Sequence, residues 1–458
     1  MMPSTKKPQI AQSEGDTNTT PARQRWQQEN LSESTQQLLA EDARYFLHQS
    51  LSTPCLNALE AAEGAYIQDV EGRRYLDFHG NQVHTVGFGN PAVIEAIKQQ
   101  LDQLSFSTRR YTNRVAVEFA KKLTSLTPEG MNKILLAPGG TNAISMAVQL
   151  ARLVTGRYKT ISMWDAFHGG TLDVMSLSGE QLFRQGVGPL MPGTEHVPPP
   201  DGYRCMWDCQ DRGGCYLKCA NYLEYVLQKE GDVAAVIAEP IRSTPYIPTK
   251  EYWQSVRAAC DKHGALLIFD EIPHALGRTG EWFTCMNFDV IPDILVIGKG
   301  IGGGILPLSV MITHEKYDVV EHKSIGHFTH EKNPVLCAAA LATLNTIEAQ
   351  DLPRRSRELG AFALQRLEQM KAAHPLIGDV RGLGLMLGIE LVRDPVTKER
   401  AITEAEQVMY KALSRGVSLK LTMGNIISIV PAMVITEAEL TQGLDVIEAC
   451  IAEVEAGL

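Results

Sequence analysis

The sequence predicts an α/β fold, with a large domain around a mostly parallel central sheet and a smaller α+β domain at the C-terminal end. Its 458 residues exceed what one hydrophobic core usually serves, so two domains that share a cleft are expected. Short β-rich apolar runs alternate with longer amphipathic stretches, which is typical of a parallel sheet with helical crossovers. After Pro334 this alternation gives way to long helical patterns.

Five apolar runs are predicted to be strands of the large sheet: Lys133–Ala137, Thr160–Trp164, Val233–Ala238, Leu266–Phe269 and Ile294–Ile297. In such sheets the ligand lies beyond the carboxyl ends of the strands. Residues suited to ligand binding follow these runs in the same order: Gly139-Gly140-Thr141, Phe167-His168, Glu239, Asp270 and Lys299. We therefore expect these residues to meet at one edge of the sheet.

The chain divides into four predicted segments. Residues 1–35 begin with a polar stretch that lacks the apolar region of a signal peptide, and they are expected to form a mobile arm. Residues 36–85 are expected to join the small domain, 86–330 to form the large domain, and 331–458 to form the small domain. In the last segment we predict a helix from Pro334, a strand over 382–391, a helix from Thr403 and a final helix opened by Thr436.

Composition excludes several classes of protein. Hydrophobic residues make up 44% and charged residues 21%, and no apolar run approaches the ~18 residues that a membrane-spanning helix needs. The net charge of -10 disfavours a nucleic-acid-binding surface. Nine cysteines, several of them in apolar surroundings, are typical of reduced thiols. We therefore expect a cytoplasmic protein with no membrane or nucleic-acid partner.

Asp270 and Lys299 are the candidate catalytic residues. Asp270 ends the apolar run LLIFD, where a carboxylate is costly unless a cation meets it. Capping of a helix or pairing with Arg278 would also satisfy it. Lys299 precedes the glycines of GKGIGGG, where the backbone can approach a flat ligand closely. Burial there would lower the pKa of the lysine and suit it to form a Schiff base and to carry a proton.

Two further runs could hold a flat, phosphorylated ligand. PGGTNA places Gly140 and Thr141 at the start of a predicted helix, where backbone N–H groups and a hydroxyl suit a phosphate, although a plain turn and cap fits equally well. Phe167 could stack on an aromatic ring or pack in the core.

Together these segments resemble the class III pyridoxal-phosphate aminotransferase family of fold type I. The resemblance runs from about Asn57 and is carried by the stretches GAYIQDVEGRRYLDF, AVIAEP, LIFDEI, GRTG, PDILVIGKGIGGG, NPVLCAAAL and RGLGLMLGIEL. It implies pyridoxal 5′-phosphate (PLP) as the cofactor. In that family the residues that match Lys299, Asp270 and Phe167 form the Schiff base, bind the ring nitrogen and stack on the ring.

The resemblance also implies a homodimer with composite active sites. Gly140 and Thr141 would hold the cofactor phosphate together with Thr329 of the partner subunit. His168 and Glu239 complete the set of residues expected to bind the cofactor.

The chain departs from the family pattern where a substrate carboxylate is handled. Many members carry an arginine in a stretch similar to GNVIRFLPPLVIT, but this chain reads GNIISIVPAMVIT, with Ser428 in its place. Many carry a glutamate in EPVQGEGG, but this chain reads EPIRSTPY, with Thr244 in its place. Losing both is expected when a buried charge pair has lost its purpose. Pro273 and Asn142 also replace a usual glutamine and glutamate near the cofactor.

We therefore expect a PLP-dependent lyase of this family. The chain is similar to members that release ammonia from an amino-alcohol phosphonate. For 1-hydroxy-2-aminoethylphosphonate, Lys299 would take a proton from the amine carbon, the β-hydroxyl would leave as water, and hydrolysis would give ammonia and phosphonoacetaldehyde. An ω-aminotransferase using an amine or aminophosphonate with a keto acid, and a phosphoethanolamine-type phospho-lyase, remain alternatives.

A phosphonate needs cationic or N–H donors at the mouth of the cleft. The candidates are Arg242, Arg109, Arg110, His84 and Lys420. Each arginine could equally be solvated, and His84 could be a core histidine.

Four cysteines stand apart from this chemistry. Cys205, Cys209, Cys215 and Cys219 form a C-x3-C-x5-C-x3-C pattern that could hold a tetrahedral metal or only shape a loop. No metal is expected in the active site.

Overall fold

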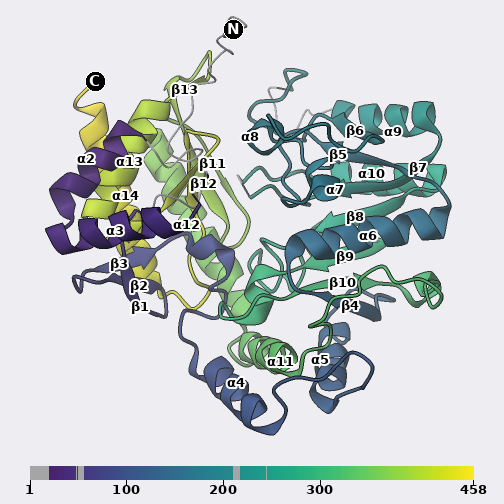
Figure 1. Ribbon diagram of the computed structural model, residues 1–458. Coiled ribbons are helices and arrows are strands. Elements are labelled where there is room, and N and C mark those ends of the chain that lie inside the picture. The colour runs from purple at the N-terminus through teal and green to yellow at the C-terminus, as the bar shows by residue number, and fades with distance from the viewer. Residues whose placement is uncertain (1–19, 48, 50–55, 210–216, 244) are drawn as a thin grey trace, which may run out of the picture.

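The computed structural model describes residues 20–47, 49, 56–209, 217–243 and 245–458. A larger lobe contains a seven-stranded sheet, and a smaller lobe beside it contains the N-terminal helices and the C-terminal part of the chain (Figure 1). The large sheet has the order β4 (Lys133–Ala137), β10 (Ser309–Thr313), β9 (Ile294–Ile297), β8 (Leu266–Asp270), β7 (Val233–Ala238), β5 (Lys159–Met163) and β6 (Thr194–Val197). Only β10 runs antiparallel to its neighbours.

The large sheet is buried on both faces. Because successive side chains of a strand point to opposite faces, Ala235 and Ile237 of β7 join one hydrophobic cluster while Val236 and Ala238 join the other. The helices of this lobe are α4 (Pro91–Gln103), α5 (Arg114–Thr124), α6 (Gly140–Thr155), α7 (Leu172–Met175), α8 (Gln181–Arg184), α9 (Lys218–Glu230), α10 (Lys250–His263) and α11 (Pro334–Ala349). α6 crosses one face of the sheet (Figure 1), and α11 packs on α4 and α5.

The smaller lobe holds two further sheets. In one, β12 (Leu387–Asp394) pairs antiparallel with β11 (Ile377–Gly382), β13 (Glu399–Arg400) and β16 (Ile426–Ile429), and β16 pairs with β15 (Lys420–Thr422). The other contains β1 (Leu59–Glu63), β2 (Tyr66–Asp69), β3 (Arg74–Asp77) and β14 (Val417–Ser418). Since β3 and β14 pair, the N-terminal segment is joined directly to the C-terminal part of the chain.

Four helices of this lobe precede the last one: α2 (Pro21–Asn30), α3 (Glu33–Tyr45), α12 (Leu352–Ala373) and α13 (Ile402–Ser414). The last helix, α14 (Glu437–Glu455), begins with a capping box in which Thr436 and Glu439 satisfy each other's backbone N–H groups. Short 3₁₀ helices, η1 (Gly80–Gln82), η2 (Thr284–Phe288), η3 (Lys299–Gly302) and η4 (Glu315–Tyr317), occur in loops.

The fold class and the five predicted strands of the large sheet are confirmed, with end points that differ by at most one residue. β6 and β10 had not been predicted. The single strand expected over 382–391 is wrong: 382 ends β11, a turn follows, and β12 begins at Leu387. The helix from Pro334 ends at Ala349 and a second helix follows it.

The mobile arm predicted for 1–35 is also wrong where the structure describes it. Trp26 of α2 is 5% exposed, and its indole N–H donates to Ser414 Oγ of α13 at 2.9 Å. An aromatic side chain therefore anchors this polar helix, which composition alone did not reveal. Residues 1–19 lie outside the described residues. The boundaries at 85/86 and 330/331 stay predictions.

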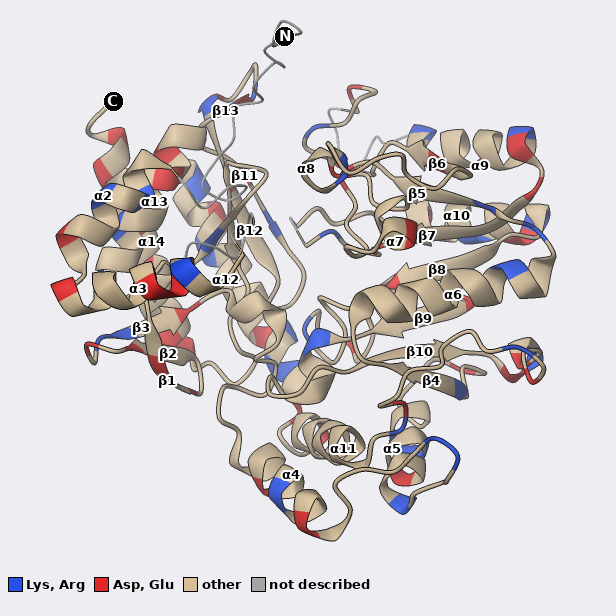
Figure 2. Cartoon of the chain, in the orientation of Figure 1, with Lys and Arg blue, Asp and Glu red and all other residues tan. Residues whose placement is uncertain are grey.

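Charged side chains of both signs are interspersed over the outer helices and loops, while the strands of the large sheet are nearly free of them (Figure 2). In the described part of the chain, no helix is both long and apolar enough to cross a membrane.

Candidate active site

A cavity of about 510 Å³ lies beyond the carboxyl ends of the strands of the large sheet. It is lined by all but one of the residues predicted to bind a cofactor: Gly140, Thr141, Phe167, His168, Glu239, Asp270 and Lys299. These residues lie in or next to the loops that follow β4, β5, β7, β8 and β9. Parallel strands place such loops at one edge, which brings together residues far apart in the sequence.

Lys299 follows β9 and opens η3. Its backbone is left-handed, with φ 47°, a conformation that is uncommon outside glycine and concentrates at functional sites. Its Nζ donates a hydrogen bond to Gln82 Oε1 at 2.7 Å. Burial lowers the pKa of its amine to about 8, because desolvation outweighs the attraction of Glu239 and Asp270. The neutral, nucleophilic form of the amine is therefore a minority at pH 7, but far more abundant than it would be at the ordinary lysine pKa of 10.5.

Asp270 ends β8 at the wall of the cavity and is 2% exposed. Its Oδ2 lies 2.8 Å from His168 Nδ1, and its Oδ1 accepts a hydrogen bond from the Ile272 N–H at 3.2 Å. Burial raises the pKa of Asp270, and the contact with His168 opposes that rise. Pairing with Arg278 is not observed, because Arg278 donates instead to the Pro431 carbonyl oxygen at 2.8 Å.

The start of α6 forms the polar floor of the cavity. Gly140 is its first residue, so backbone N–H groups without helical partners face the cavity end. Thr141 Oγ1 accepts a hydrogen bond from the Gly170 N–H at 3.3 Å. A Cβ at Gly169, whose φ is +142°, would lie 2.2 Å from Thr141 Oγ1, so only glycine allows this close approach.

Phe167 presents a ring that is 36% exposed to the cavity side of the lobe. Its centroid lies 4.2 Å from that of Phe183, at an interplanar angle of 41°. The Phe167 N–H donates to Glu239 Oε1 at 3.2 Å, which holds the loop against the end of β7. The Phe167 ring can therefore stack against a flat ligand in the cavity.

These residues fit PLP. A buried carboxylate, Asp270, offers a counter-charge that a ring nitrogen cation would satisfy, and Phe167 offers an aromatic face. Lys299 offers an amine of lowered pKa, and the start of α6 offers donors for a phosphate.

Arg242 lines the cavity, and two carboxylates bind its guanidinium group. Its Nη1 donates to Glu239 Oε1 at 2.9 Å and its Nη2 to Glu180 Oε2 at 2.8 Å, and the residue is 4% exposed. Burial raises the pKa of Glu239, but the Arg242 guanidinium, the two neighbouring histidines and the Phe167 N–H together outweigh burial and hold that pKa below its usual value. Both terminal nitrogens thus bind carboxylates, although Arg242 also lines the cavity, and its role as a phosphonate ligand stays a prediction.

His84 is also unsuited to bind substrate directly. It is fully buried, packs on Phe88 with ring centroids 4.9 Å apart, and does not line the cavity. Burial lowers its pKa to about 3. It is a neutral core histidine, the alternative that the sequence had left open.

Arg109, Arg110 and Thr329 are exposed and do not line the cavity in their own chain. Arg109 Nη2 contacts the His327 ring, with 3.1 Å to Nε2, and its Nη1 lies 3.6 Å from Glu331 Oε2. Arg109 is therefore tied to the same surface loop that carries Thr329.

Ser428 and Lys420 stand directly opposite each other on β16 and β15. Directly paired residues on neighbouring strands point to the same face of the sheet. The Lys420 side chain therefore points to the same face as Ser428, the residue that replaces the family's arginine. The charge of Lys420 contributes to lowering the pKa of Lys299, which places the two amines within electrostatic reach.

Pro273 lines the cavity, whereas Thr244 lies outside the described residues.

Two residues near Lys299 were missed: Gln82 and His79. Both lie in the loop HGNQVH after β3, which departs from the helical and strand periodicities on which the predictions relied. Burial lowers the pKa of His79 well below its ordinary value, and the charges of Lys420 and Lys299 add to this lowering. A run of polar side chains directly after a buried strand was the available signal.

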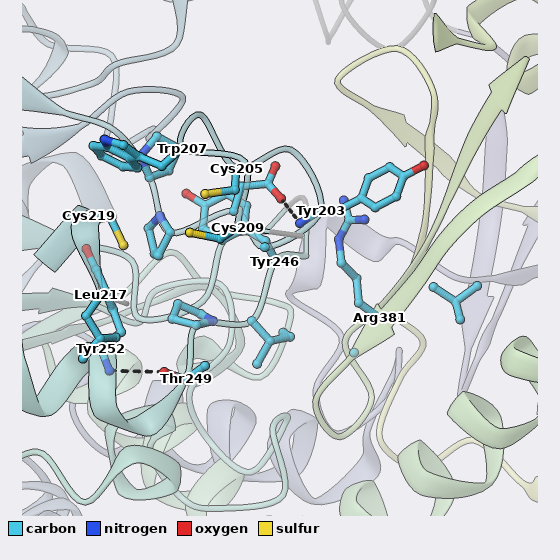
Figure 3. Close-up of a pocket in the computed structure, with 18 of the residues that line it drawn as sticks. Tyr203, Cys205, Trp207, Cys209, Leu217, Cys219, Tyr246, Thr249, Tyr252 and Arg381 are labelled. Atoms are coloured by element: carbon cyan, nitrogen blue, oxygen red, sulfur yellow. Dashed lines mark hydrogen bonds between the residues drawn. The ribbon is translucent and has the colours of Figure 1, made fainter. Parts of the chain in front are cut away.

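A second cavity, of about 200 Å³, lies beside the cysteine-containing loop (Figure 3). Cys205, Cys209 and Cys219 line it together with aromatic side chains. Within the described residues, no three His, Cys, Asp or Glu side chains are placed to hold a metal ion, and Cys215 lies outside them. This cavity does not include Lys299 or Asp270.

Comparison with known proteins places this geometry in context. The class III aminotransferase family pattern matches residues 48–451. The (R)-1-hydroxy-2-aminoethylphosphonate ammonia-lyase of Vibrio splendidus (strain 12B01) is 49% identical over 96% of this chain and 95% of its own length. The leucine/methionine racemase of Thermococcus litoralis is 36% identical, over 86% of this chain and 90% of its own.

Solved structures agree in fold. A Bacillus anthracis aminotransferase is 30% identical and superposes with a TM-score of 0.85, covering 92% of this chain and 99% of that one. An amine transaminase from an uncultivated Pseudomonas species, solved in its PLP-bound form, is 29% identical with a TM-score of 0.83, covering 89% and 98%.

Proposed function

This chain belongs to the class III aminotransferase family, and on that premise we propose that it is a PLP-dependent ammonia-lyase acting on 1-hydroxy-2-aminoethylphosphonate. The products would be ammonia and phosphonoacetaldehyde. The observation that carries the proposal is the pair of Ser428 and Lys420: the position of the family's carboxylate-binding arginine is neutral, and a cation stands opposite it. The Vibrio splendidus ammonia-lyase supports the same assignment.

The residues of the cavity have distinct tasks. PLP, when bound, supplies an electron sink for the charge left when a proton leaves the amine carbon. Lys299 would hold the cofactor, Asp270 would meet its ring nitrogen, and Phe167 would support its ring. Gly140 and Thr141 would hold its phosphate, with His168 fixing the orientation of Asp270 and Glu239 anchoring the Phe167 loop.

Lys299 then works as both base and acid. Displaced by the substrate amine, its neutral form accepts the proton from the amine carbon, which a pKa of about 8 favours near neutral pH. The resulting ammonium is held by Gln82 Oε1 and gives a proton to the departing β-hydroxyl as the C–O bond breaks, so that water leaves. The released enamine is hydrolysed by water to ammonia and the aldehyde.

The same proposal includes a homodimer with composite sites. Phe106 and Tyr111 are 39% and 67% exposed, and they flank Arg109 on the surface that also carries Thr329. Phe106 contacts the His330 ring edge-on, with centroids 5.4 Å apart. Exposed apolar side chains gathered around polar groups are typical of an interface, and pairing there would carry Thr329 and Arg109 toward a second copy.

A cytoplasmic location is also proposed. Cys260, Cys285 and Cys337 are buried thiols in no disulfide, and burial raises the pKa of each. Such thiols fit a reducing compartment.

Ammonia release without a keto acid tests the function. Purified holoenzyme is incubated with (R)-1-hydroxy-2-aminoethylphosphonate, and ammonia and aldehyde are measured; equal amounts of both are expected. Parallel reactions contain phosphoethanolamine, or 2-aminoethylphosphonate with pyruvate. Phosphate release from phosphoethanolamine alone would identify a phospho-lyase, and alanine formation from pyruvate without ammonia release would identify an aminotransferase; either result would overturn the proposal.

A further inference from the structure

The segment that leads into the short helix α8 is bound to the loop that carries Phe167. The Ala166 carbonyl oxygen accepts a hydrogen bond from the Gly179 N–H at 2.8 Å. The His168 N–H donates to Ser178 Oγ at 3.0 Å. The residues on either side of Phe167 are therefore both held by the residues that precede α8.

α8 is itself anchored to the strands at this end of the large sheet. The guanidinium carbon of Arg184, its last residue, lies 5.2 Å from the centroid of the Trp164 ring. The Trp164 ring in turn stacks on His196 of β6, with centroids 4.6 Å apart. A Cβ at Gly179 would lie 2.2 Å from the Met163 carbonyl oxygen, so this segment packs directly on the end of β5. The contacts give α8 a defined position relative to β5 and β6.

Phe183 of α8 contacts the Phe167 ring directly. The two ring centroids lie 4.2 Å apart, at an interplanar angle of 41°. Aromatic pairs at such distances attract each other beyond the effect of the area that they bury. Phe167 lines the cavity and Phe183 does not, so Phe183 supports the ring from outside the cavity.

Glu180, the residue before α8, reaches the backbone of Phe167 through two further charged side chains. Its Oε2 accepts a hydrogen bond from Arg242 Nη2 at 2.8 Å, and Arg242 Nη1 donates to Glu239 Oε1 at 2.9 Å. Glu239 Oε1 also accepts from the Phe167 N–H at 3.2 Å. Because Arg242 and Glu239 are buried, salt and water screen these ion pairs only weakly. The ring and the backbone of Phe167 are thus both connected to α8.

We propose that Phe183 and Glu180 are positioning residues that fix the Phe167 ring in the orientation that supports the cofactor. The inference rests on the proposed function, because that function assigns Phe167 to the cofactor ring. A side chain that is ordered before its ligand arrives loses less conformational entropy when the ligand binds. Loss of either contact should therefore weaken the retention of PLP, although neither residue is assigned to touch it.

The release of PLP from the holoenzyme tests the contact made by Phe183. Phe183→Met keeps an apolar side chain but removes the ring, whereas Phe183→Tyr keeps the ring. After dilution into buffer without PLP, the visible absorption of the bound cofactor should decay about threefold to tenfold faster in Phe183→Met and at nearly the wild-type rate in Phe183→Tyr. The visible circular dichroism of the bound cofactor, which reports how its ring is held, should change in Phe183→Met alone.

The matched control removes an aromatic side chain from another pair. Tyr225 of α9 is 54% exposed and stacks on Tyr222, with centroids 6.4 Å apart, and neither residue lines the cavity. Tyr225→Met should leave both the release rate and the circular dichroism unchanged. An equal change in Tyr225→Met and Phe183→Met would overturn the inference.

Glu180→Gln tests the second contact, because it removes the charge beside Arg242 and keeps the shape of the side chain. PLP release should become about twofold to fivefold faster, as expected for the loss of a partly exposed ion pair. Gln181→Ala, at the exposed neighbouring position, is the control and should release PLP at the wild-type rate.

A Phe167→Met background shows whether both residues act through Phe167. In that background Phe183→Met and Glu180→Gln should change the release rate by less than about twofold, because the ring that they position is gone. The same acceleration in both backgrounds would overturn the inference, as would unchanged release in the chain that keeps Phe167.

These measurements contain no substrate, so they separate the inference from the proposed reaction. If the wild type releases no ammonia while Phe183→Met speeds PLP release only in the chain that keeps Phe167, the proposed reaction fails and the positioning role stands. If Phe167→Met itself leaves PLP release unchanged, the positioning role fails even when ammonia is formed.

Discussion

The amine of Lys299 donates a hydrogen bond to the side-chain oxygen of Gln82 at 2.7 Å. Both residues have left-handed backbone, with φ 47° and 63°, a conformation that costs free energy in residues other than glycine. The left-handed backbone at Gln82 and at Lys299 thus places the uncharged amide oxygen of Gln82 against the Lys299 amine. Because an amide oxygen accepts from the amine in either protonation state, it can orient Lys299 without committing it to the ammonium form.

Replacing Gln82 with Glu should raise the pKa of Lys299, since a carboxylate in contact favours the ammonium form by about one to three pH units. The pH at which kcat reaches half its maximum should move upward accordingly. The kcat–pH profile of Gln82→Glu measures this, and Asn81→Asp, which adds the same charge at an exposed neighbouring position, is the control. An unchanged midpoint would show that the contact is not maintained during turnover.

The wild-type pH dependence follows from burial of Lys299. Its ordinary pKa of 10.5 is lowered to about 8. Since only the neutral amine can take a proton from carbon, kcat should fall as the pH drops through about 8 and level off above it. A kcat profile determined at saturating substrate checks this. A midpoint near the ordinary lysine value would contradict the assignment of Lys299 as the base.

Lys299→Ala should reduce ammonia release by a factor on the order of 10⁴ or more, because it removes both the cofactor attachment and the base. The variant should also fail to retain the visible absorption of a cofactor bound through lysine after dialysis. Lys316→Ala, at an exposed lysine, should retain both properties. Full activity in Lys299→Ala would exclude the proposed mechanism.

Asp270→Asn tests the charge at the end of β8. Removing the carboxylate while keeping its shape should lower kcat by a factor on the order of 10²–10³, as expected for a charge that stabilises the transition state. KM should change little, because Asp270 is assigned to the ring of the cofactor and not to the anionic end of the substrate. Steady-state kinetics of this variant beside Asp318→Asn, at an exposed aspartate, provide the comparison. Equal kcat in both variants would remove Asp270 from the mechanism.

Arg242→Met tests whether Arg242 stabilises the fold through its ion pairs with Glu239 and Glu180 or binds the substrate. The change leaves Glu239, 5% exposed, without its cationic partner, which should lower the free energy of unfolding by about 3–5 kcal/mol. Denaturant unfolding of the variant measures this. If stability is instead unchanged and only the KM for the phosphonate rises, Arg242 contacts the substrate after all.

The large-domain part of the site could be predicted from the sequence. Asp270 and Lys299 each follow a short apolar run directly, and parallel strands bring their carboxyl ends to one edge, so a position after a strand already implies a position at the cavity. Phe167 and Thr141 follow the same logic. The motif resemblance then assigned their chemistry, because each residue keeps the family's spacing.

Gln82, His79 and Lys420 could not be placed in this way. They reach Lys299 only because β3 pairs with β14 and β15 pairs with β16, and no local periodicity specifies which distant strands will pair. Arg242 shows the converse: its charge suggested an anion site, but the fold brings Glu239 and Glu180 against it. The sequence by itself determined the fold class, the residues of the large domain that meet at the cavity, and the absence of an arginine at Ser428. Only the tertiary structure decided which groups surround each cation, because the net charge at a point depends on every group that folding brings near it.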